Sequence, residues 1–285
     1  ACGPAVPPDA PKLVESNKPA TAEVDELDQA LPLDARITKG TLDNGLTYYV
    51  LPHQKPEKRA QLWLAVNAGS VLEDEDQRGL AHFVEHMGFN GTKRFPKQEL
   101  IAFLEKAGVR FGADLNAYTS FDETVYKLQL PTDDPTFLTR GLSVLRDWAD
   151  GMSFDADEVE KERGVVLEEW RLGRGARMRL FDKQAPVVFN GSKYAERITI
   201  GKPEIIKNAS RETLMRYYRD WYRPDLMAVI AVGDFDPKAI EASIKAEFGS
   251  MPARTEPKPR PRVFAEVPAH EQTLVSIESD RELPT

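Results

Sequence analysis

Five consecutive residues have the types and spacing needed to bind a metal ion and use it. They are His82-Phe83-Val84-Glu85-His86, an H-x-x-E-H sequence. On a helix, His82 and His86 are one turn apart on the same face, where two imidazoles can bind one Zn²⁺. Glu85 lies beside them and can accept a proton from water at the metal. The chain has only four histidines, so this pattern favours a zinc site over two histidines without a function.

The third zinc ligand must be a carboxylate. A catalytic zinc usually takes three protein ligands and leaves one position for water, and the only cysteine, Cys2, is at the terminus. The expected helix over 157–172 offers Glu162, Glu168 and Glu169. Glu162 and Glu169 are two turns apart and share a face, whereas Glu168 points about 100° away. The residues alone leave the choice between Glu162 and Glu169 open.

Apolar periodicity and turn residues indicate the elements that position these groups. Helices are expected over 76–87, 97–107, 135–148, 157–172, 211–221 and 237–248. Strands are expected over 46–51, 61–66, 124–130 and 227–232. The turn residues Asp43-Asn44-Gly45 before the first strand indicate that the chain opens with antiparallel strands.

Composition bounds the class of protein. With 285 residues, 41% of them hydrophobic and 29% charged, the chain can bury a full core and is not disordered. It contains no apolar run of membrane-spanning length. Its net charge of −8 argues against nucleic acid as a partner, because nucleic-acid binding needs a basic surface.

The composition also changes along the chain. Residues 1–35 are rich in Pro, Ala and acidic residues and predict a flexible tether, and 36–250 form the zinc-binding domain. Residues 251–285 predict a Pro-rich linker and then, at Thr273 to Ile277, the first strand of a second, truncated domain. Cys2 stands between a small residue and a Pro-rich stretch, as at the mature end of a bacterial lipoprotein. This predicts a lipid anchor and a location in the bacterial periplasm or cell envelope.

Several motifs, in order, carry a resemblance to a known family. They are the segment 82–87 with Phe89-Asn90-Gly91-Thr92, the stretch 111–126, Glu162-Arg163 to Glu169-Trp170, Trp221-Tyr222-Arg223-Pro224 and Val232-Gly233-Asp234-Phe235. From about residue 36 onward the chain resembles the pitrilysin and mitochondrial-processing-peptidase family of zinc peptidases, the inverzincins, and most of all its bacterial periplasmic branch. The resemblance implies an α+β fold in which a mainly antiparallel sheet packs against helices. It makes this chain the N-terminal, metal-binding half of a clamshell.

The same resemblance implies roles for single residues. His82, His86 and Glu169 would bind one Zn²⁺ per chain, Glu85 would act as general base, and Glu162 would support the site from behind the ligands. Relatives with a shorter spacing place the third ligand at Glu162, and extra loop residues here account for the difference. Residues Asn116, Ala117, Tyr118 and Thr119 match the edge strand on which an extended peptide substrate is bound.

The expected activity is zinc-dependent hydrolysis of peptide bonds in unfolded peptides or oligopeptides through a metal-activated water. In the family a second, similar domain or a partner chain closes over the first and supplies an Arg and a Tyr, and no residue here matches that pair. We therefore expect the fragment alone to have low activity. The alternative from the sequence is a non-catalytic scaffold or peptide-binding subunit of the same fold that needs a partner half.

Overall fold

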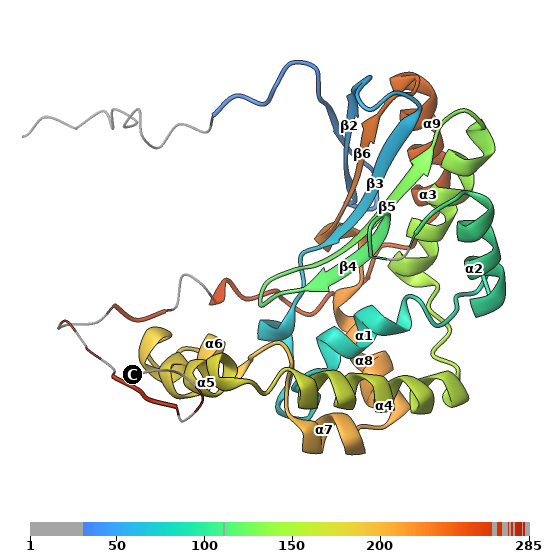
Figure 1. The fold of residues 1–285 in the computed structure, drawn as a ribbon. Helices are drawn as coiled ribbons and strands as arrows, with labels where there is room; N and C mark the ends of the chain where they lie inside the picture. The colour runs from blue at the N-terminus through green and yellow to red at the C-terminus, as the bar shows by residue number, and fades with distance from the viewer. Residues whose placement is uncertain are drawn as a thin grey trace, which may run out of the picture. The chain divides into compact units, whose positions relative to one another are not determined.

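The structure, a computed structural model, describes residues 31–110, 112–263, 267–269, 273, 275, 277–280 and 282. The described residues from 35 onward belong to one compact unit. Its centre is a six-stranded sheet (Figure 1). The strands are β1 (Thr38–Thr41), β2 (Thr47–Pro52), β3 (Arg59–Val66), β4 (Leu115–Thr119), β5 (Thr124–Pro131) and β6 (Met227–Gly233).

The strand order across the sheet is β1-β2-β6-β3-β5-β4. Only the β2–β6 pair is parallel, and the other four pairs are antiparallel. The mainly antiparallel sheet with packed helices confirms the expected fold class. β4 pairs only with β5 among the described residues, so it forms one edge of the sheet.

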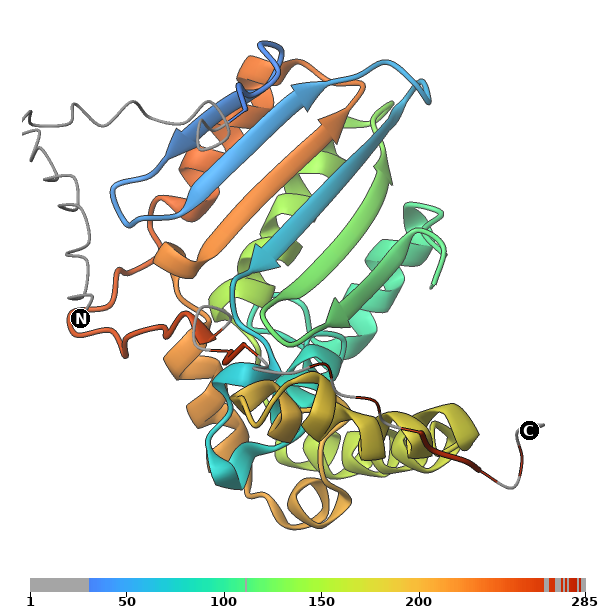
Figure 2. The same ribbon diagram turned by 90° about the vertical axis from the view of Figure 1, so that its left-hand side faces the viewer.

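Alternate residues of the inner strands face a helical layer, because successive strand side chains point to opposite faces. The inward residues are fully buried, as with Leu62 and Leu64 on β3 and Val229 on β6. Helices α3 (Pro135–Asp150) and α9 (Pro237–Phe248) pack on that face. The opposite face of the sheet is turned toward the viewer in Figure 2, and no described helix crosses it.

A second group of helices packs below β4 and β5 (Figure 1). Helix α1 (Leu80–Met87) packs against α4 (Ala156–Leu172), α8 (Arg211–Trp221) and β4. Helices α2 (Lys97–Lys106), α5 (Ala176–Val188), α6 (Lys193–Glu196) and α7 (Pro203–Asn208) complete the described helices of four or more residues. None of the described helices is long and apolar enough to span a membrane.

The structure corrects two expectations. Helix α1 begins at Leu80 rather than near Asp76, because residues Glu75–Gln77 form a separate 3₁₀ turn and Gly79 has a left-handed φ of 100°. Strands β2 and β3 are not neighbours, because β6 lies between them. The turn at 43–45 instead joins β2 to β1, a strand that the sequence pattern did not indicate.

The division into a tether, a zinc-binding domain and a second domain stays a prediction. Residues 1–30, including Cys2, lie outside the described part of the chain. The expected strand over 273–277 falls partly outside it too, since 274 and 276 are not described.

Candidate metal centre

Helix α1 carries His82, Glu85 and His86, and a buried carboxylate fixes where it begins. Oε1 of Glu73 accepts hydrogen bonds from the backbone N–H of Gly79 at 3.0 Å and of Ala81 at 2.8 Å. These are among the N–H groups that a helix cannot satisfy internally. A residue in the loop just before α1 therefore sets the first turn of the helix that bears the histidines.

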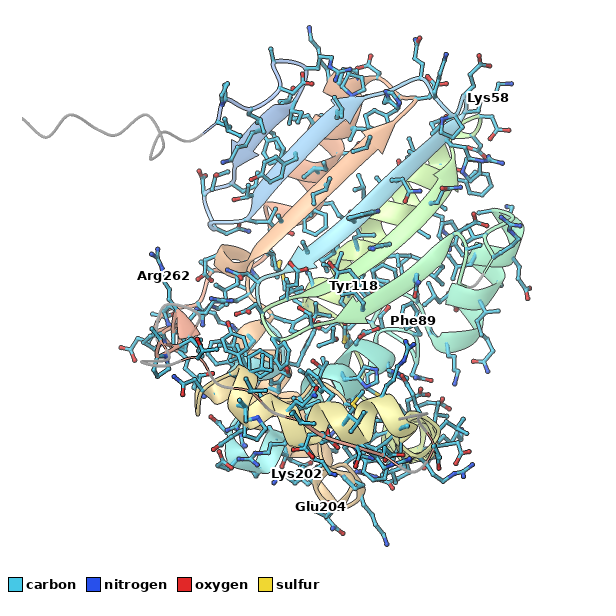
Figure 3. All side chains as sticks on the ribbon, turned by 60° about the vertical axis from the view of Figure 1, so that its left-hand side comes forward. Lys58, Phe89, Tyr118, Lys202, Glu204 and Arg262 are labelled. Atoms are coloured by element: carbon cyan, nitrogen blue, oxygen red, sulfur yellow. The ribbon has the colours of Figure 1, made fainter. Side chains whose placement is uncertain are left out.

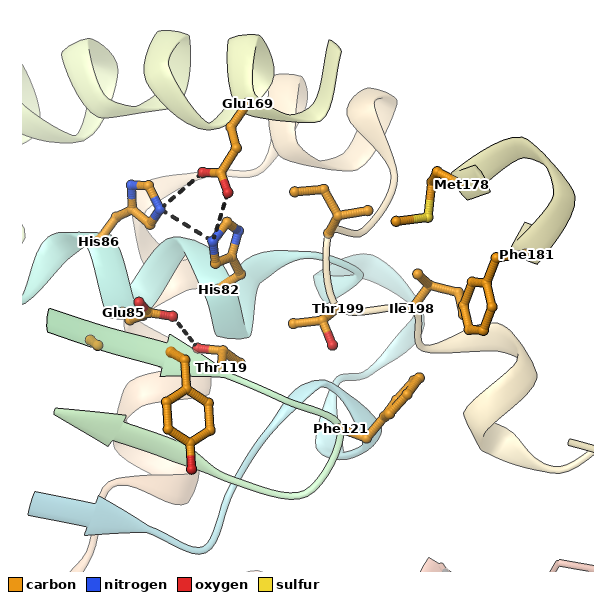
Figure 4. Close-up of a pocket in the computed structure, with 13 residues that line it drawn as sticks. His82, Glu85, His86, Thr119, Phe121, Glu169, Met178, Phe181, Ile198 and Thr199 are labelled. Atoms are coloured by element: carbon orange, nitrogen blue, oxygen red, sulfur yellow. Dashed lines mark hydrogen bonds and ion pairs between the residues drawn. The ribbon is translucent and has the colours of Figure 1, made fainter. Parts of the chain in front are cut away.

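The side chains of His82, His86 and Glu169 meet between α1 and α4. The two Nε2 atoms lie 3.2 Å apart. Nε2 of His82 is 3.7 Å from Oε1 of Glu169, and Nε2 of His86 is 3.4 Å from Oε2 of the same carboxylate. Together they form the only cluster of three potential metal-binding side chains within the described residues (Figure 4).

This triangle fits a zinc ion. Zinc with nitrogen and oxygen ligands is tetrahedral with bonds of about 2.0–2.1 Å, which puts neighbouring ligand atoms about 3.3 Å apart. The three observed separations lie around that value. Two imidazoles and one carboxylate also form one of the ligand sets of catalytic zinc, which keeps a fourth position open.

Glu162 takes part in the site without facing the triangle. Its Oε1 lies 2.7 Å from Nδ1 of His86, and its Oε2 accepts a hydrogen bond from Nδ2 of Asn90 at 2.9 Å. The contact holds the proton of the His86 ring on Nδ1 and leaves Nε2 free to bind a metal. The two glutamates on one face of α4 thus occupy different positions.

Glu85 lies next to the triangle and contacts the sheet edge. Its Oε2 accepts a hydrogen bond of 2.6 Å from the hydroxyl of Thr119 on β4. The side chain of Glu85 is buried, and this burial raises its pKa, although the Thr119 hydrogen bond opposes the shift. A carboxylate with a raised pKa is a stronger base.

The two histidines have different protonation behaviour. Burial and the nearby charge of His86 lower the pKa of His82 to about 4, so His82 is neutral near pH 7. Burial also lowers the pKa of His86, but the hydrogen bond and charge of Glu162 outweigh it and raise the pKa. The same hydrogen bonds, from His86 and Asn90, outweigh burial at Glu162 and lower its pKa. A metal ion at the triangle would take the place of the proton on Nε2 of His86, while the proton on Nδ1 would stay with Glu162.

A cavity of about 510 Å³ opens beside the triangle. Of the four expected substrate-binding residues, Ala117, Tyr118 and Thr119 line it, whereas Asn116 does not. The far wall is apolar and comes from three segments, of which only the one with Phe121 belongs to a recognised motif; its residues are Phe121, Met178, Phe181, Ile198 and Ile200 (Figure 4). The sequence analysis missed these residues because they are scattered over three segments.

The sequence analysis also assigned no role to Asn90 and Glu73. For Asn90 the sequence did offer an indication, because it follows His86 by one helical turn. In the structure its Nδ2 also donates a hydrogen bond to the backbone oxygen of His86 at 3.0 Å. For Glu73 the sequence offered no indication, because its contact depends on the turn that brings Gly79 back to its carboxylate.

Comparison with known proteins gives the family. The profile described as "Insulinase (Peptidase family M16)" matches residues 48–172, and the one described as "Peptidase M16 inactive domain" matches residues 208–284. Together they span most of the chain. The chain belongs to peptidase family M16. The three groups of the metal triangle lie within the first match, and β6 and α9 lie within the second.

Two M16 relatives are 43–44% identical to this chain. One is a "Zinc protease PQQL-like" of Arabidopsis thaliana, which is 44% identical over 85% of this chain and 25% of the relative's length. The other is a "Probable zinc protease PqqL" of Haemophilus influenzae, which is 43% identical over 75% of this chain and 23% of the relative's length. The chain therefore spans about a quarter of the length of these relatives.

Solved M16 structures share the fold. The first half of the periplasmic protease PqqL from Escherichia coli superposes with a TM-score of 0.77 and 39% identity over 81% of this chain and 50% of that one. The full-length PqqL structure matches equally well over 26% of its length. Pitrilysin, at 24% identity and a TM-score of 0.66, shares the fold.

Proposed function

We propose that this chain is the metal-binding half of a zinc-dependent peptidase that hydrolyses peptide bonds of unfolded peptides. The single observation that carries the proposal is the triangle of His82, His86 and Glu169 beside the buried carboxylate of Glu85. A scaffold subunit has no need for a base next to three metal-binding groups. We therefore favour the enzyme over the scaffold alternative.

One zinc per chain would be held by Nε2 of His82, Nε2 of His86 and the carboxylate of Glu169. When bound, zinc supplies a Lewis acid that stabilises negative charge on the scissile carbonyl. Glu162 is assigned a positioning role, because it contacts the ring nitrogen of His86 that does not face the triangle. Because the lowered pKa of His82 keeps its ring neutral near pH 7, His82 would not have to lose a proton before binding the metal.

Glu85 would act as the general base. One of its oxygens is engaged by Thr119, so the other is available to take a proton from the attacking water. The protonated carboxyl then returns this proton to the leaving amine. The raised pKa of Glu85 supports both steps, because it brings the group closer to neutral pH.

The substrate would bind in an extended form along β4. β4 has an unpaired edge among the described residues, and its residues Ala117, Tyr118 and Thr119 line the cavity. Backbone hydrogen bonds to such an edge provide affinity for many sequences, while side-chain pockets provide preference. Asn116 belongs to the same strand but contacts its own neighbour, the Ala117 N–H.

We further propose that a second half of the fold, as a later part of the same protein or a partner chain, completes the active site and supplies an Arg and a Tyr. The first-half and full-length PqqL structures support this. Residues 1–285 alone should then bind zinc but cleave peptides slowly. The periplasmic PqqL relative supports a location in the bacterial periplasm, and anchoring through Cys2 remains our proposal from the sequence.

Metal content tests the site. Zinc is measured by elemental analysis after metal-replete purification in the wild type, Glu169→Gln, Glu162→Gln and the control Glu168→Gln. Glu168 is exposed on the same helix and pairs with Arg171. We expect about one zinc per chain in the wild type, its loss in Glu169→Gln, and retention in the other two.

Other results would change the assignment. Loss of zinc in Glu162→Gln with retention in Glu169→Gln would make Glu162 the third ligand. A wild type without zinc under metal-replete conditions would contradict the proposed function. Rapid cleavage of peptides by residues 1–285 alone would contradict the need for a second half.

A further inference from the structure

Lys97, the first residue of α2, is a basic residue at a place where a helix does not favour one. The N-terminus of a helix carries a partial positive charge, so a cation there costs stability and an acidic residue adds to it. Nζ of Lys97 instead donates hydrogen bonds to Oδ1 of Asn90 at 2.7 Å and to Oε2 of Glu158 at 2.7 Å. Asn90 follows α1 and Glu158 lies on α4. Lys97 therefore joins the two helices that bear the metal triangle.

Asn90 connects Lys97 to Glu162. It follows Phe89, which Figure 3 shows between the sheet and the second group of helices, and its side chain is buried. Its Nδ2 donates to Oε2 of Glu162 at 2.9 Å and to the backbone oxygen of His86 at 3.0 Å. With the amide reversed, its oxygen would face these two acceptors and its NH₂ group would face the Lys97 ammonium. The three contacts therefore fix Nδ2 toward Glu162.

The contacts form one continuous chain of hydrogen bonds from Lys97 through Asn90 and Glu162 to His86. Its three links are 2.7, 2.9 and 2.7 Å long. The chain ends on Nδ1 of His86, and Nε2 of the same ring belongs to the metal triangle. Lys97 is thus three hydrogen bonds away from a metal-binding ring.

The charges on α4 also favour a cation at this place. Glu158 and Glu162 lie one turn apart, and like charges at this spacing repel. Lys97 contacts Glu158 directly and Glu162 through Asn90, so it offsets both charges. Lys161 binds the other oxygen of Glu158 at 2.6 Å, but its side chain is 67% exposed.

The loop between Asn90 and Lys97 is tied down by its own contacts. The backbone N–H of Thr92 donates to the Phe95 oxygen at 2.9 Å, and the Thr92 hydroxyl donates to the buried carboxylate of Asp147 at 2.7 Å. A buried hydrogen bond to a charged group is among the stronger ones in a protein. The loop therefore returns Lys97 to Asn90 in a defined position.

We propose that Lys97 is a positioning residue of the metal centre, which acts through Asn90 and Glu162 to hold the His86 ring with Nε2 toward the metal. The inference rests on the proposed function and adds to it a residue outside the metal triangle. Loss of Lys97 would leave the buried oxygen of Asn90 without its donor. Any rotation of the amide that brings this oxygen to water would take Nδ2 away from Glu162.

The sign of the effect separates this role from simple electrostatics. Removal of a positive charge near a divalent cation should by itself tighten the binding of that cation, because it removes a repulsion. Loss of a positioning residue should weaken the binding, because the ligand is no longer held in place.

Zinc affinity tests the proposal. Competition against a chromophoric chelator gives the dissociation constants of the wild type, Lys97→Met, Lys106→Met, and Glu162→Gln with and without Lys97→Met. Lys106 is exposed at the other end of α2, and its substitution changes the net charge equally.

We expect Lys97→Met to weaken zinc binding about three- to tenfold, which is less than the about 10–100-fold cost of losing a direct partner of a ligand. Lys106→Met should bind zinc as the wild type does. In the Glu162→Gln background Lys97→Met should have no further effect, because the chain of hydrogen bonds is already broken there.

The His86 ring gives a second measurement that needs no metal. In the metal-free chain labelled with ¹⁵N, the Nδ1 proton that His86 shares with Glu162 gives an imidazole resonance, which is assigned by its loss in His86→Gln. A weaker hydrogen bond moves this resonance upfield and speeds its exchange with water. We expect both changes in Lys97→Met and neither in Lys106→Met. A role limited to the ion pair of Lys97 with Glu158 would leave the resonance in place.

Three outcomes overturn the proposal: a zinc affinity of Lys97→Met equal to or tighter than that of Lys106→Met, an equal loss of affinity with and without Glu162→Gln, or an unchanged His86 resonance in Lys97→Met. The second outcome would indicate a general loss of stability. The proposed function is judged separately, because a wild type that binds no zinc contradicts it. The resonance of the metal-free chain then decides on Lys97 alone: a shift in Lys97→Met supports its positioning role.

Discussion

Nδ1 of His86 and Oε1 of Glu162 lie 2.7 Å apart. This contact is on the side of the ring away from the metal triangle, so in the proposed site Glu162 would orient the imidazole and hold its Nδ1 proton without being a ligand. Groups in such places tune metal affinity through the ligands that they hold.

Glu162→Gln should weaken zinc binding without changing its stoichiometry at saturation. The neutral amide cannot stabilise the ring of His86 as a carboxylate does, and loss of such partners costs about 10–100-fold in metal affinity. Competition against a chromophoric chelator measures the dissociation constant. An affinity equal to that of Glu168→Gln would show that the His86 contact does not matter.

Thr119→Val should reduce catalysis and leave zinc binding unchanged. The valine has the shape of threonine but cannot donate the 2.6 Å hydrogen bond to Glu85. Hydrogen bonds to charged groups contribute about 1.5–3 kcal/mol, so kcat should fall at least about tenfold with the second half of the fold supplied. Thr119→Ser, which retains the hydroxyl, is the control. A rise in KM alone would assign Thr119 to substrate binding instead.

Glu73 should make the protein less stable as the pH rises. Burial raises its pKa from 4.5 to about 8, although the Ala81 and Gly79 N–H groups oppose the shift. Between these two pH values the folded state keeps a proton that the unfolded state has released. The proton on Glu73 therefore contributes fully to the free energy of unfolding below pH 4.5. This contribution is lost as the pH rises to about 8, at about 1.4 kcal/mol per pH unit.

Glu73→Gln should remove this decline, because an amide does not titrate. Urea unfolding of both proteins at several pH values between 5 and 8 gives the difference in their free energies of unfolding. The free energy of unfolding of Glu73→Gln should increase relative to that of the wild type as the pH rises. Parallel curves would mean that Glu73 is already ionised in the folded protein at pH 5.

Two glycine-to-alanine substitutions should have opposite effects on stability. Gly201 has a φ of 72°, and a Cβ there would contact the Cα of Gly79, the residue before α1. Gly201→Ala should therefore lower the free energy of unfolding by about 1–3 kcal/mol. Gly164 lies on the exposed side of α4 with open space around it, and Gly164→Ala should raise stability by about 0.5–1 kcal/mol. Thermal unfolding of both variants checks the pair, and equal effects would contradict the close packing at Gly79.

The sequence was informative where a single local period set the geometry. The spacing of His82 and His86 and the shared face of Glu162 and Glu169 follow from the helical repeat alone. The repeat could not decide which of these glutamates faces the histidines, because that depends on which turn of α4 packs over α1.

The pairing of strands that are far apart in the chain could not be predicted from the sequence. Strand β6 lies between β2 and β3, and no pattern in residues 46–66 indicates a partner from residue 227 onward. Helix α5, which brings Met178 and Phe181 to the cavity, was missed because it contains Pro186 and has charged residues among its apolar ones. Its position depends on tertiary packing rather than helix propensity.

The central place of β6 also has a consequence for biosynthesis. Strand β2 lacks its parallel partner, and β3 lacks one of its two partners, until residues 227–233 have left the ribosome. The H-x-x-E-H helix is thus translated long before the sheet beside it can close, and a nascent chain halted earlier would expose two apolar strands. Closure of the sheet beside the candidate metal centre is therefore a late event, timed by a strand that contributes none of the three metal-binding side chains.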